Sequence, residues 1–285
     1  MSKCFITDNV LIAFETMHHI SQKKNGKVGE MALKLEMSKA YKRVEWGCLE
    51  KIMLKMGFNT QWVDIMMRCV CFVTYFVKIN GKPRGIITPT TGLRQGDLLT
   101  PYLFLFCAEG LSALIRYLVE HGAIKGIAAC VRGPSISHLF FRDDNLIFCQ
   151  ATGEECSNLI DILEKYELTS GQQLNKEKTS LFFSCNTLQI VQDEIKNRFG
   201  AKIIKQHEKY LGLLSLVGKN KCNTFHQLIE MLDSKLLGWK EKLLSNAGKE
   251  ILIKTMAQAM PTYTMRVFRD ETTLWLGGAM APLKF

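Results

Sequence analysis

The chain has 285 residues, of which 47% are hydrophobic and 22% are charged, and its net charge is +10. These are ordinary values for a globular protein of one large or two smaller domains, and they exclude a low-complexity chain. The positive charge favours a polyanionic partner, with a simply basic protein as an equal alternative. No apolar run in the sequence reaches transmembrane length, so we expect no membrane partner.

The ten cysteines indicate a reducing compartment rather than a disulfide framework or a metal site. They show no C-x-x-C spacing, and Cys69 and Cys71 are too close together for a zinc knuckle. Cys107, Cys149 and Cys185 lie inside apolar runs, as reduced core thiols do. We therefore expect an intracellular protein with these thiols in its core.

The N-terminal part predicts a helix, a loop and a strand. Residues 10–18 have roughly helical apolar spacing, and the Asp8-Asn9 pair offers an N-cap. The basic stretch 23–27 is interpreted as a solvated turn, which we favour over a phosphate contact. Residues 31–37 predict a buried strand that carries an acid, Glu36, at its end.

Two helices and a hairpin follow. Residues 38–46 lead through a turn into a helix, and a second helix includes residues 62–69. Residues 72–79 are rich in β-branched and aromatic side chains and predict a strand. Asn80-Gly81 is a strong hairpin signal, so the strand is expected to return through Ile86-Ile87.

A glycine-bounded loop precedes the longest apolar helix. The loop 92–96 carries Arg94 and Gln95 between two glycines, and a helix follows over 100–119 with Pro101 at its start. Such a loop before a helix N-terminus can hold a phosphate or a base. A plain helix-entry loop explains the spacing equally well.

Residues 138–148 form the most informative stretch of the chain. Two adjacent acids, Asp143 and Asp144, lie between short apolar runs, so the pattern predicts a β-hairpin with the acids at its tip. Two carboxylates at a tip repel each other and stabilise no core, and a bound divalent cation would remove that cost. A solvated turn is the structural alternative.

The rest of the chain alternates helices and short strands. We expect an amphipathic helix around 156–166, a strand at 180–183, a helix closed by Phe199-Gly200, and a short strand at 210–213 that returns to the core. Residues 224–257 predict basic helices that either follow a nucleic-acid backbone or form a solvated face. The lysines assigned to nucleic-acid binding are Lys235, Lys240, Lys242 and Lys249.

The order of these segments resembles the reverse transcriptases of plant LINE-type, non-LTR retrotransposons. The resemblance covers about residues 8–268 and comprises several motifs in the same order. It implies an α+β fold, a polymerase palm of antiparallel sheet with packed helices, partial fingers and a helical thumb-like C-terminal part. The matching segments are Glu36-Met37-Ser38-Lys39-Ala40-Tyr41 for motif A, Gly92-Leu93-Arg94-Gln95-Gly96-Asp97 for motif B, Phe141-Arg142-Asp143-Asp144 for motif C, Gly171-Gln172 through Lys178 for motif D, and Gly238-Trp239-Lys240 for the thumb.

The resemblance divides the chain into four expected segments. They are a fingers remnant at 1–30, a palm with fingers insertions at 31–215, a thumb-like segment at 216–268 and an irregular tail at 269–285. Only 35 residues precede Glu36, so a truncated copy without most of the fingers is expected. The family's integration chemistry also implies a nuclear location.

RNA-directed DNA polymerase activity by a two-metal mechanism is the implied function. By resemblance, Glu36, Asp143 and Asp144 would hold two Mg²⁺ ions, one at the primer 3′-hydroxyl and one at the nucleotide triphosphate. Lys178 would donate a proton to the leaving pyrophosphate. The implied partners are an RNA template, a DNA primer and dNTPs.

Substrate-binding positions follow from the same resemblance. Tyr41 would lie under the sugar as a gate against ribonucleotides, and Arg94, Gln95 and Gly96 would line the nucleotide and the template. For Tyr41 and Lys178 taken singly, core packing or a plain surface position is the alternative.

The sequence departs from the family pattern at four positions. Glu36 stands where the family has aspartate, and a displacement of about 1 Å in a reacting group can cost roughly 100-fold in rate. Lys42 replaces the second acid of motif A, and Leu98 replaces a proline. Arg142 replaces a small residue and would compete with Mg²⁺ for the paired acids. Together these departures predict a decayed copy that is weak or inactive.

Other functions stay open, so the sequence does not decide whether the protein is an enzyme. A non-catalytic nucleic-acid-binding remnant would keep the basic cleft without the chemistry. A palm-fold nucleotidyl cyclase would also place acids on a hairpin, but the Arg94-Gln95-Gly96 loop and the basic C-terminal helices count against it. A pseudogene-like chain without a present biochemical role is the simplest alternative.

Overall fold

The structure, a computed structural model, divides into two compact units. One unit is 19–205, and the other combines 1–18 with 206–285. The four segments expected from the sequence stay a prediction. The described residues are 6–130, 133–141, 144–204, 209–210, 213–214, 230, 234, 245–252 and 254.

A five-stranded sheet forms the centre of the unit 19–205. Its strand order is β5-β6-β1-β8-β9, and neighbouring strands are antiparallel except for the parallel pair β8 and β9. Helices pack against this sheet, so the predicted α+β class with an antiparallel sheet is confirmed. The strands are β1 (Glu30–Leu35), β5 (His138–Phe141), β6 (Asp144–Gln150), β8 (Ser180–Phe183) and β9 (Lys202–Ile203).

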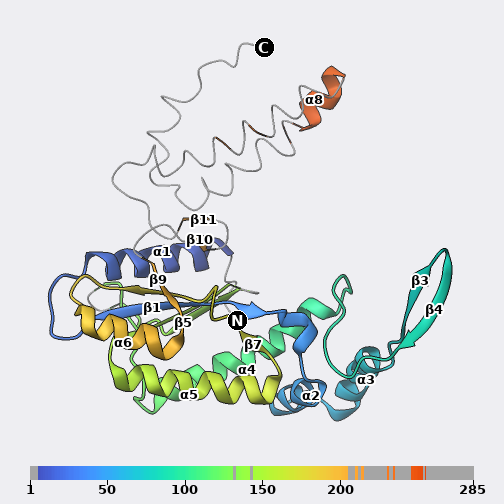
Figure 1. The fold of residues 1–285 in the computed structure, drawn as a ribbon, viewed down its shortest axis with the longest axis horizontal. Coiled ribbons are helices and arrows are strands. Elements are labelled where there is room, and N and C mark those ends of the chain that lie inside the picture. Colours follow the sequence, from blue (N-terminus) through green and yellow to red (C-terminus); the bar gives the residue numbers. More distant parts are fainter. Residues whose placement is uncertain are drawn as a thin grey trace. The chain divides into compact units, whose positions relative to one another are not determined.

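Five helices of this unit agree with the predicted helical patterns. In Figure 1, α4 and α5 lie side by side beneath the sheet. Their apolar sides join the core because residues three and four apart share one helix face. The helices are α2 (Trp46–Lys55), α3 (Thr60–Cys71), α4 (Thr100–Glu120), α5 (Gly153–Ser170) and α6 (Gln189–Phe199).

Helix α4 corrects the expectation that no apolar run is long enough to span a bilayer. Its 21 residues have a mean hydropathy of 1.5, so by length and composition it passes the test for a membrane span. In this structure one side of α4 is buried in the core, where Leu103, Cys107, Leu111 and Ile115 pack. The same apolar run therefore serves as a core helix here.

Three two-stranded sheets complete the described strands. Asn80 and Gly81 both have positive φ, at 50° and 81°, so the predicted tight hairpin turn between β3 and β4 is confirmed. The short strand predicted at 210–213 is wrong in its placement, because this stretch forms its own hairpin instead of returning to the central sheet. These pairs are β2 (Met37–Ser38) with β7 (Gln173–Leu174), β3 (Tyr75–Ile79) with β4 (Lys82–Ile87), and β10 (Lys209–Tyr210) with β11 (Leu213–Leu214).

The terminal helices differ in part from the prediction. Helix α1 (Ile6–Gln22) begins before the expected cap, so Asp8 lies in its first turn and is not the N-cap. An acid there still interacts favourably with the helix dipole. Two further helical elements are the 3₁₀ turn η1 (Ala40–Arg43) and α8 (Asn246–Leu252). Most of the predicted helical stretch 224–257 lies outside the described residues.

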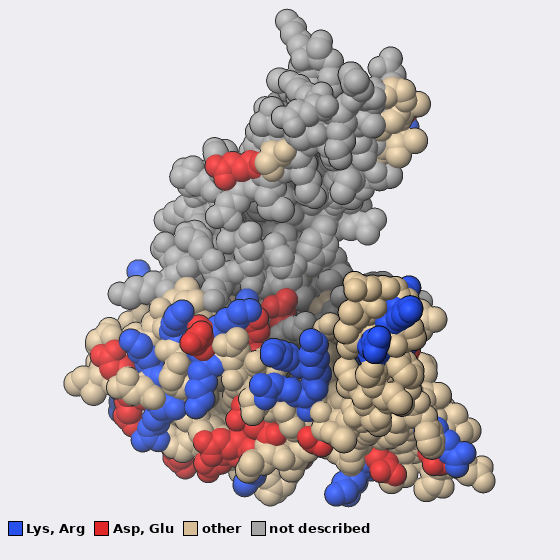
Figure 2. Space-filling model, turned by 45° about the vertical axis from the view of Figure 1, so that its right-hand side comes forward, with Lys and Arg blue, Asp and Glu red and all other residues tan. Residues whose placement is uncertain are grey.

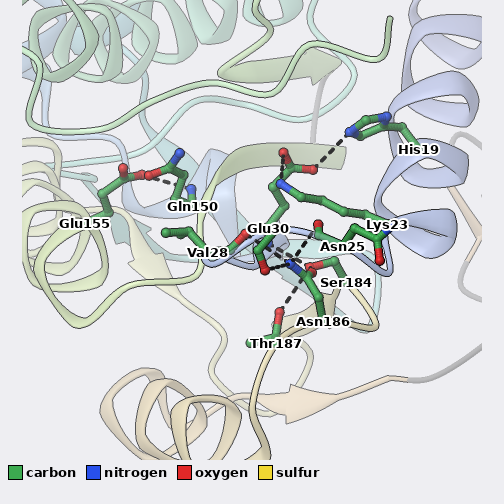
Figure 3. Close-up of polar contacts among 11 residues, drawn as sticks. His19, Lys23, Asn25, Val28, Glu30, Gln150, Glu155, Ser184, Asn186 and Thr187 are labelled. Carbon is green, nitrogen blue, oxygen red and sulfur yellow. Dashed lines mark hydrogen bonds and ion pairs between the residues drawn. The ribbon is translucent and has the colours of Figure 1, made fainter.

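The beginning of β1 is held by a polar network (Figure 3). Glu30 accepts from Lys23 Nζ at 2.6 Å and lies 3.2 Å from His19 Nε2, while its backbone N–H donates to Ser184 Oγ at 2.8 Å. Asn186 Nδ2 donates to the carbonyls of residues 25, 26 and 28 at 3.1–3.3 Å. The basic loop is therefore an ordered turn tied to the sheet.

The predicted core thiols are confirmed in two of three cases. Cys107 and Cys149 are buried, and burial raises the pKa of Cys107 to about 12. Cys185 is exposed, so its assignment to the core is wrong: it lies two residues after the end of β8, where the chain has left the sheet. The eight cysteines in the described part of the chain are free thiols.

Candidate active site

The central strand pair, β1 and β6, brings two of the predicted acids to the same end of the sheet. In the antiparallel register of β1 and β6, Leu35 pairs with Asn145. The next position outward on each strand is therefore Glu36 on one side and Asp144 on the other. Continued by one residue, the register sets positions 36 and 144 opposite each other at the end of the sheet, where opposite positions share a face.

Each of these two carboxylates has a lysine beside it. Lys178 Nζ lies 2.7 Å from Glu36 Oε1, and this hydrogen bond raises the pKa of Lys178. Lys34 Nζ lies 3.8 Å from Asp144 Oδ1. The side chains of Glu36 and Asp144 are 35% and 38% exposed, so both ion pairs are accessible to solvent.

The loop that carries Lys178 is anchored to the end of β1. Asn175 N–H donates to the Glu36 carbonyl at 2.8 Å, and the Asn175 carbonyl accepts from Lys178 N–H at 3.1 Å. Asn175 thus fixes the loop against the residue whose side chain Lys178 contacts. This contact brings the motif D segment to the end of motif A.

The segment after Glu36 is held by the glycine loop of motif B. Gly92 N–H donates to the Val44 carbonyl at 2.8 Å, Leu93 N–H donates to the Tyr41 carbonyl at 2.7 Å, and Trp46 Nε1 donates to the Gly92 carbonyl at 2.8 Å. A side chain at position 92 would place its Cβ 2.7 Å from the Lys42 carbonyl oxygen. The close approach requires glycine.

Tyr41 packs against the N-terminal half of α4. Its ring stacks on Phe104 with centroids 4.4 Å apart, and the side chain is half-buried against the core. Tyr41 therefore packs against the core, as the core-packing alternative predicts. A position under a nucleotide sugar stays a prediction.

A pocket of about 280 Å³ lies beside this segment. The exposed side chains of Lys42, Arg94, Gln95 and Asp97 line it, together with the partly buried Trp46. Gly96 is exposed in the same loop, with φ at 91°. The pocket thus joins the position of the replaced motif A acid to the predicted substrate-binding loop.

Several predicted site residues lie outside the described part of the chain. Asp143 and Arg142, which lie between β5 and β6 in the sequence, are among them. Lys249 belongs to α8, but its side chain is not described. The described residues include no group of three His, Cys, Asp or Glu side chains that could hold a metal ion. Lys235, Lys240 and Lys242 also lie outside the described residues.

Sequence reasoning missed Lys34. It is a single cation inside a strand whose other central residues, Met31 to Leu33 and Leu35, are buried. Side chains two positions apart on a strand share a face, so the positions of Lys34 and Glu36 belong to the same face of the sheet. That isolated charge, next to a candidate acid in an apolar strand, is the signal that could have identified it.

A protein-family model and a curated relative both match this chain. The family model of reverse transcriptase (RNA-dependent DNA polymerase) matches residues 4–214. An uncharacterized mitochondrial protein of Arabidopsis thaliana is 49% identical over 75 residues, which is 26% of this chain and 62% of that protein.

Two telomerase structures were also found. Apo telomerase from Candida tropicalis, truncated from the C-terminal domain, has a TM-score of 0.46 and 16% identity, covering 63% of this chain and 35% of that chain. Telomerase from Candida albicans, in complex with the TWJ fragment of telomeric RNA, has a TM-score of 0.49 and 14% identity, covering 96% and 43%. The chain thus spans less than two thirds of each relative's length.

The family model covers the central sheet, the glycine loop 92–96 and the loop that carries Lys178. It matches well over half of the chain, and the predicted resemblance to reverse transcriptases is thereby confirmed. The chain belongs to the reverse transcriptase (RNA-dependent DNA polymerase) family.

Proposed function

We propose that this domain is the palm of a LINE-type, non-LTR retrotransposon reverse transcriptase, built for two-metal nucleotidyl transfer on an RNA template. The observation that supports this most is the register of β1 and β6, which sets positions 36 and 144 opposite each other at one end of the central strands. The sequence adds a third acid, Asp143, immediately before Asp144. The proposed partners are an RNA template, a DNA primer and dNTPs.

The donor set fits magnesium. Carboxylate oxygens are the ligands that Mg²⁺ prefers, and sites of this kind use few protein ligands plus substrate phosphates. Glu36, Asp143 and Asp144 would hold the ions. Bound ions would activate the primer 3′-hydroxyl and neutralise the charge that develops on the triphosphate.

The chain's own side chains have separate tasks in this proposal. Lys178 holds a proton at Nζ, within reach of the site because of its contact with Glu36. Arg94 and Gln95 line the neighbouring pocket, where a cation and an amide suit a phosphate and a base. Tyr41 keeps the pocket segment in place through its stacking on Phe104.

We propose further that this copy is impaired. Lys178 and Lys34 each lie beside a carboxylate that would have to bind metal, so a metal ion competes with both ammonium groups. Lys42, an exposed cation of the pocket lining, stands where the family has an acid. The longer side chain of Glu36 adds a change in carboxylate position.

Primer extension on an RNA template with Mg²⁺ and dNTPs tests the activity. Low but measurable extension that disappears in Asp144→Asn is the expected result. The triple change Glu36→Asp, Lys42→Asp and Arg142→Ala should raise extension if these residues limit it. Activity of the unchanged chain equal to that of an intact relative would contradict the impairment.

A non-catalytic nucleic-acid-binding remnant is the second candidate function. The two lysine–carboxylate pairs favour it, because Lys178 and Lys34 offset the charges of Glu36 and Asp144 without any metal ion. It predicts RNA–DNA duplex binding that weakens steeply with salt and is the same in Mg²⁺ and in EDTA. Mg²⁺-dependent extension would contradict it. For either function we propose an intracellular, nuclear location, to be checked by imaging the tagged chain.

A further inference from the structure

The β3–β4 hairpin is an exposed ribbon outside the carboxylate site. It projects from the right-hand side of the unit in Figure 1. None of its residues from Tyr75 to Ile79 or from Lys82 to Ile87 is buried. Large apolar side chains are among the exposed ones, including Phe76 at 57% and Ile86 at 71%. An apolar surface of this kind on one element marks an interaction site.

The charge of this surface has a single sign. The sequence from residue 65 to residue 96 contains no Asp or Glu, between Asp64 and Asp97. The ribbon itself carries three exposed cations, Lys78, Lys82 and Arg84. Figure 2 turns this side forward and shows a mainly tan projection with Lys and Arg at its outer end. The surface is therefore complementary to a polyanion.

The strand register interleaves these cations with apolar side chains. Val77 pairs with Arg84 and Ile79 pairs with Lys82, so each pair puts a cation beside a β-branched residue on one face. Phe76 pairs with Ile86 on the other face, which Lys78 shares, and the register shifts between Phe76 and Val77. Cations that alternate with apolar and aromatic groups suit a chain of phosphates carrying unpaired bases.

The ribbon is also continuous with the pocket beside the candidate site. Tyr75, the first residue of β3, lines the pocket together with Arg94 and Gln95. A strand that occupies the pocket can therefore continue along the ribbon, where the described side chains include no acid. A second copy of this chain fits less well, because its three ribbon cations would face the same three cations.

We propose that the β3–β4 ribbon binds single-stranded nucleic acid, with phosphates on Lys78, Lys82 and Arg84 and bases against Phe76 and its apolar neighbours. The inference takes the polyanion from the proposed function but does not need catalysis. Its test measures binding alone, so it can fail while polymerase activity is found, and it can hold in an inactive chain.

The first test uses fluorescence anisotropy of the full chain with a labelled single-stranded RNA longer than about 16 nucleotides. Affinity is measured between about 50 and 200 mM salt. Lys78→Ser, Lys82→Ser and Arg84→Ser together should reduce the slope of log K against log salt by about 2, since each cation contributes about 0.7. Lys51→Ser, Lys55→Ser and Lys165→Ser, on exposed positions of α2 and α5, remove the same charge and should leave the slope nearly unchanged.

The second test concerns the bases. Phe76→Ala should weaken RNA binding roughly 5- to 150-fold if one base stacks there. Leu168→Ala, an 86% exposed apolar residue of α5, is the matched control and should have no effect. Equal effects of the ribbon and control variants would overturn the proposal. So would unchanged RNA affinity with loss of self-association in sedimentation, which would make the ribbon a protein interface.

Discussion

Lys178 Nζ and Glu36 Oε1 form a 2.7 Å ion pair between the loop after β7 and the end of β1. The proposed proton donor and a proposed metal ligand therefore satisfy each other in this structure. A metal ion that binds Glu36 has to displace the ammonium group, and a lysine that serves the pyrophosphate has to leave the carboxylate. One contact thus links metal affinity to the chemistry of the leaving group.

Removing this lysine is expected to strengthen metal binding. Lys178→Met should lower the Kd for Mn²⁺ by about two- to fivefold, because exposed ion pairs are modest in strength. Binding is measured by isothermal titration. Lys176→Met, an exposed cation two residues away, removes the same net charge and is the control. Equal shifts in the two variants would mean that Lys178 does not compete for Glu36.

Two glycines with the same φ make it possible to distinguish the cost of a steric clash from the cost of a strained backbone when each is replaced by alanine. Gly92 and Gly96 both have φ at 91°, but an added Cβ meets the Lys42 backbone at position 92 and open space at position 96. Gly92→Ala should therefore lose roughly 1–3 kcal/mol more unfolding free energy than Gly96→Ala. Urea unfolding with equal m-values gives this difference. Equal losses would show that the loop moves away from residues 40–46 without cost.

Glu155 gives a pH-dependent prediction. Burial raises the pKa of this carboxyl above 4.5, against the lowering effect of the N–H groups of Gln150 and Lys125. The folded state then holds the proton more tightly than the unfolded state, so this contribution to stability is complete below pH 4.5 and is lost as the pH rises through the raised value.

The unfolding free energy of the unchanged chain relative to Glu155→Gln should therefore fall as the pH increases above 4.5. Urea unfolding of both proteins across this range measures the trend. Glu154→Gln, the exposed neighbour, is the control. A relative stability that rises with pH would reverse the sign and contradict the desolvated environment of Glu155.

The network at the start of β1 predicts a loss of stability without a loss of the candidate site. Glu30 is 13% exposed in its side chain and neutralises Lys23, so Glu30→Gln leaves a partly buried cation unpaired. We expect a loss of roughly 1–3 kcal/mol, between the values for exposed and buried pairs. Thermal unfolding should show a lower Tm than that of Glu177→Gln, an exposed control. Identical Tm values would make the network dispensable.

The elements that the sequence predicts well are those with a local cause. Turn chemistry and apolar spacing predict the Asn80-Gly81 turn, helix α4 with Pro101 in its first turn, and the pairing of β5 with β6. The predicted N-cap at Asp8 was wrong, because an acidic residue is as favourable in the first turn of a helix as at its cap.

The sequence by itself determined the α+β class, the family and the candidate acids, because alternation, turns and motif order are properties of neighbouring residues. Only the tertiary structure decided which charges meet. The partners Lys34 with Asp144 and Lys178 with Glu36 come from strands and loops more than 100 residues apart. Strand register and packing determine such contacts, and the spacing of residues along the chain does not predict them.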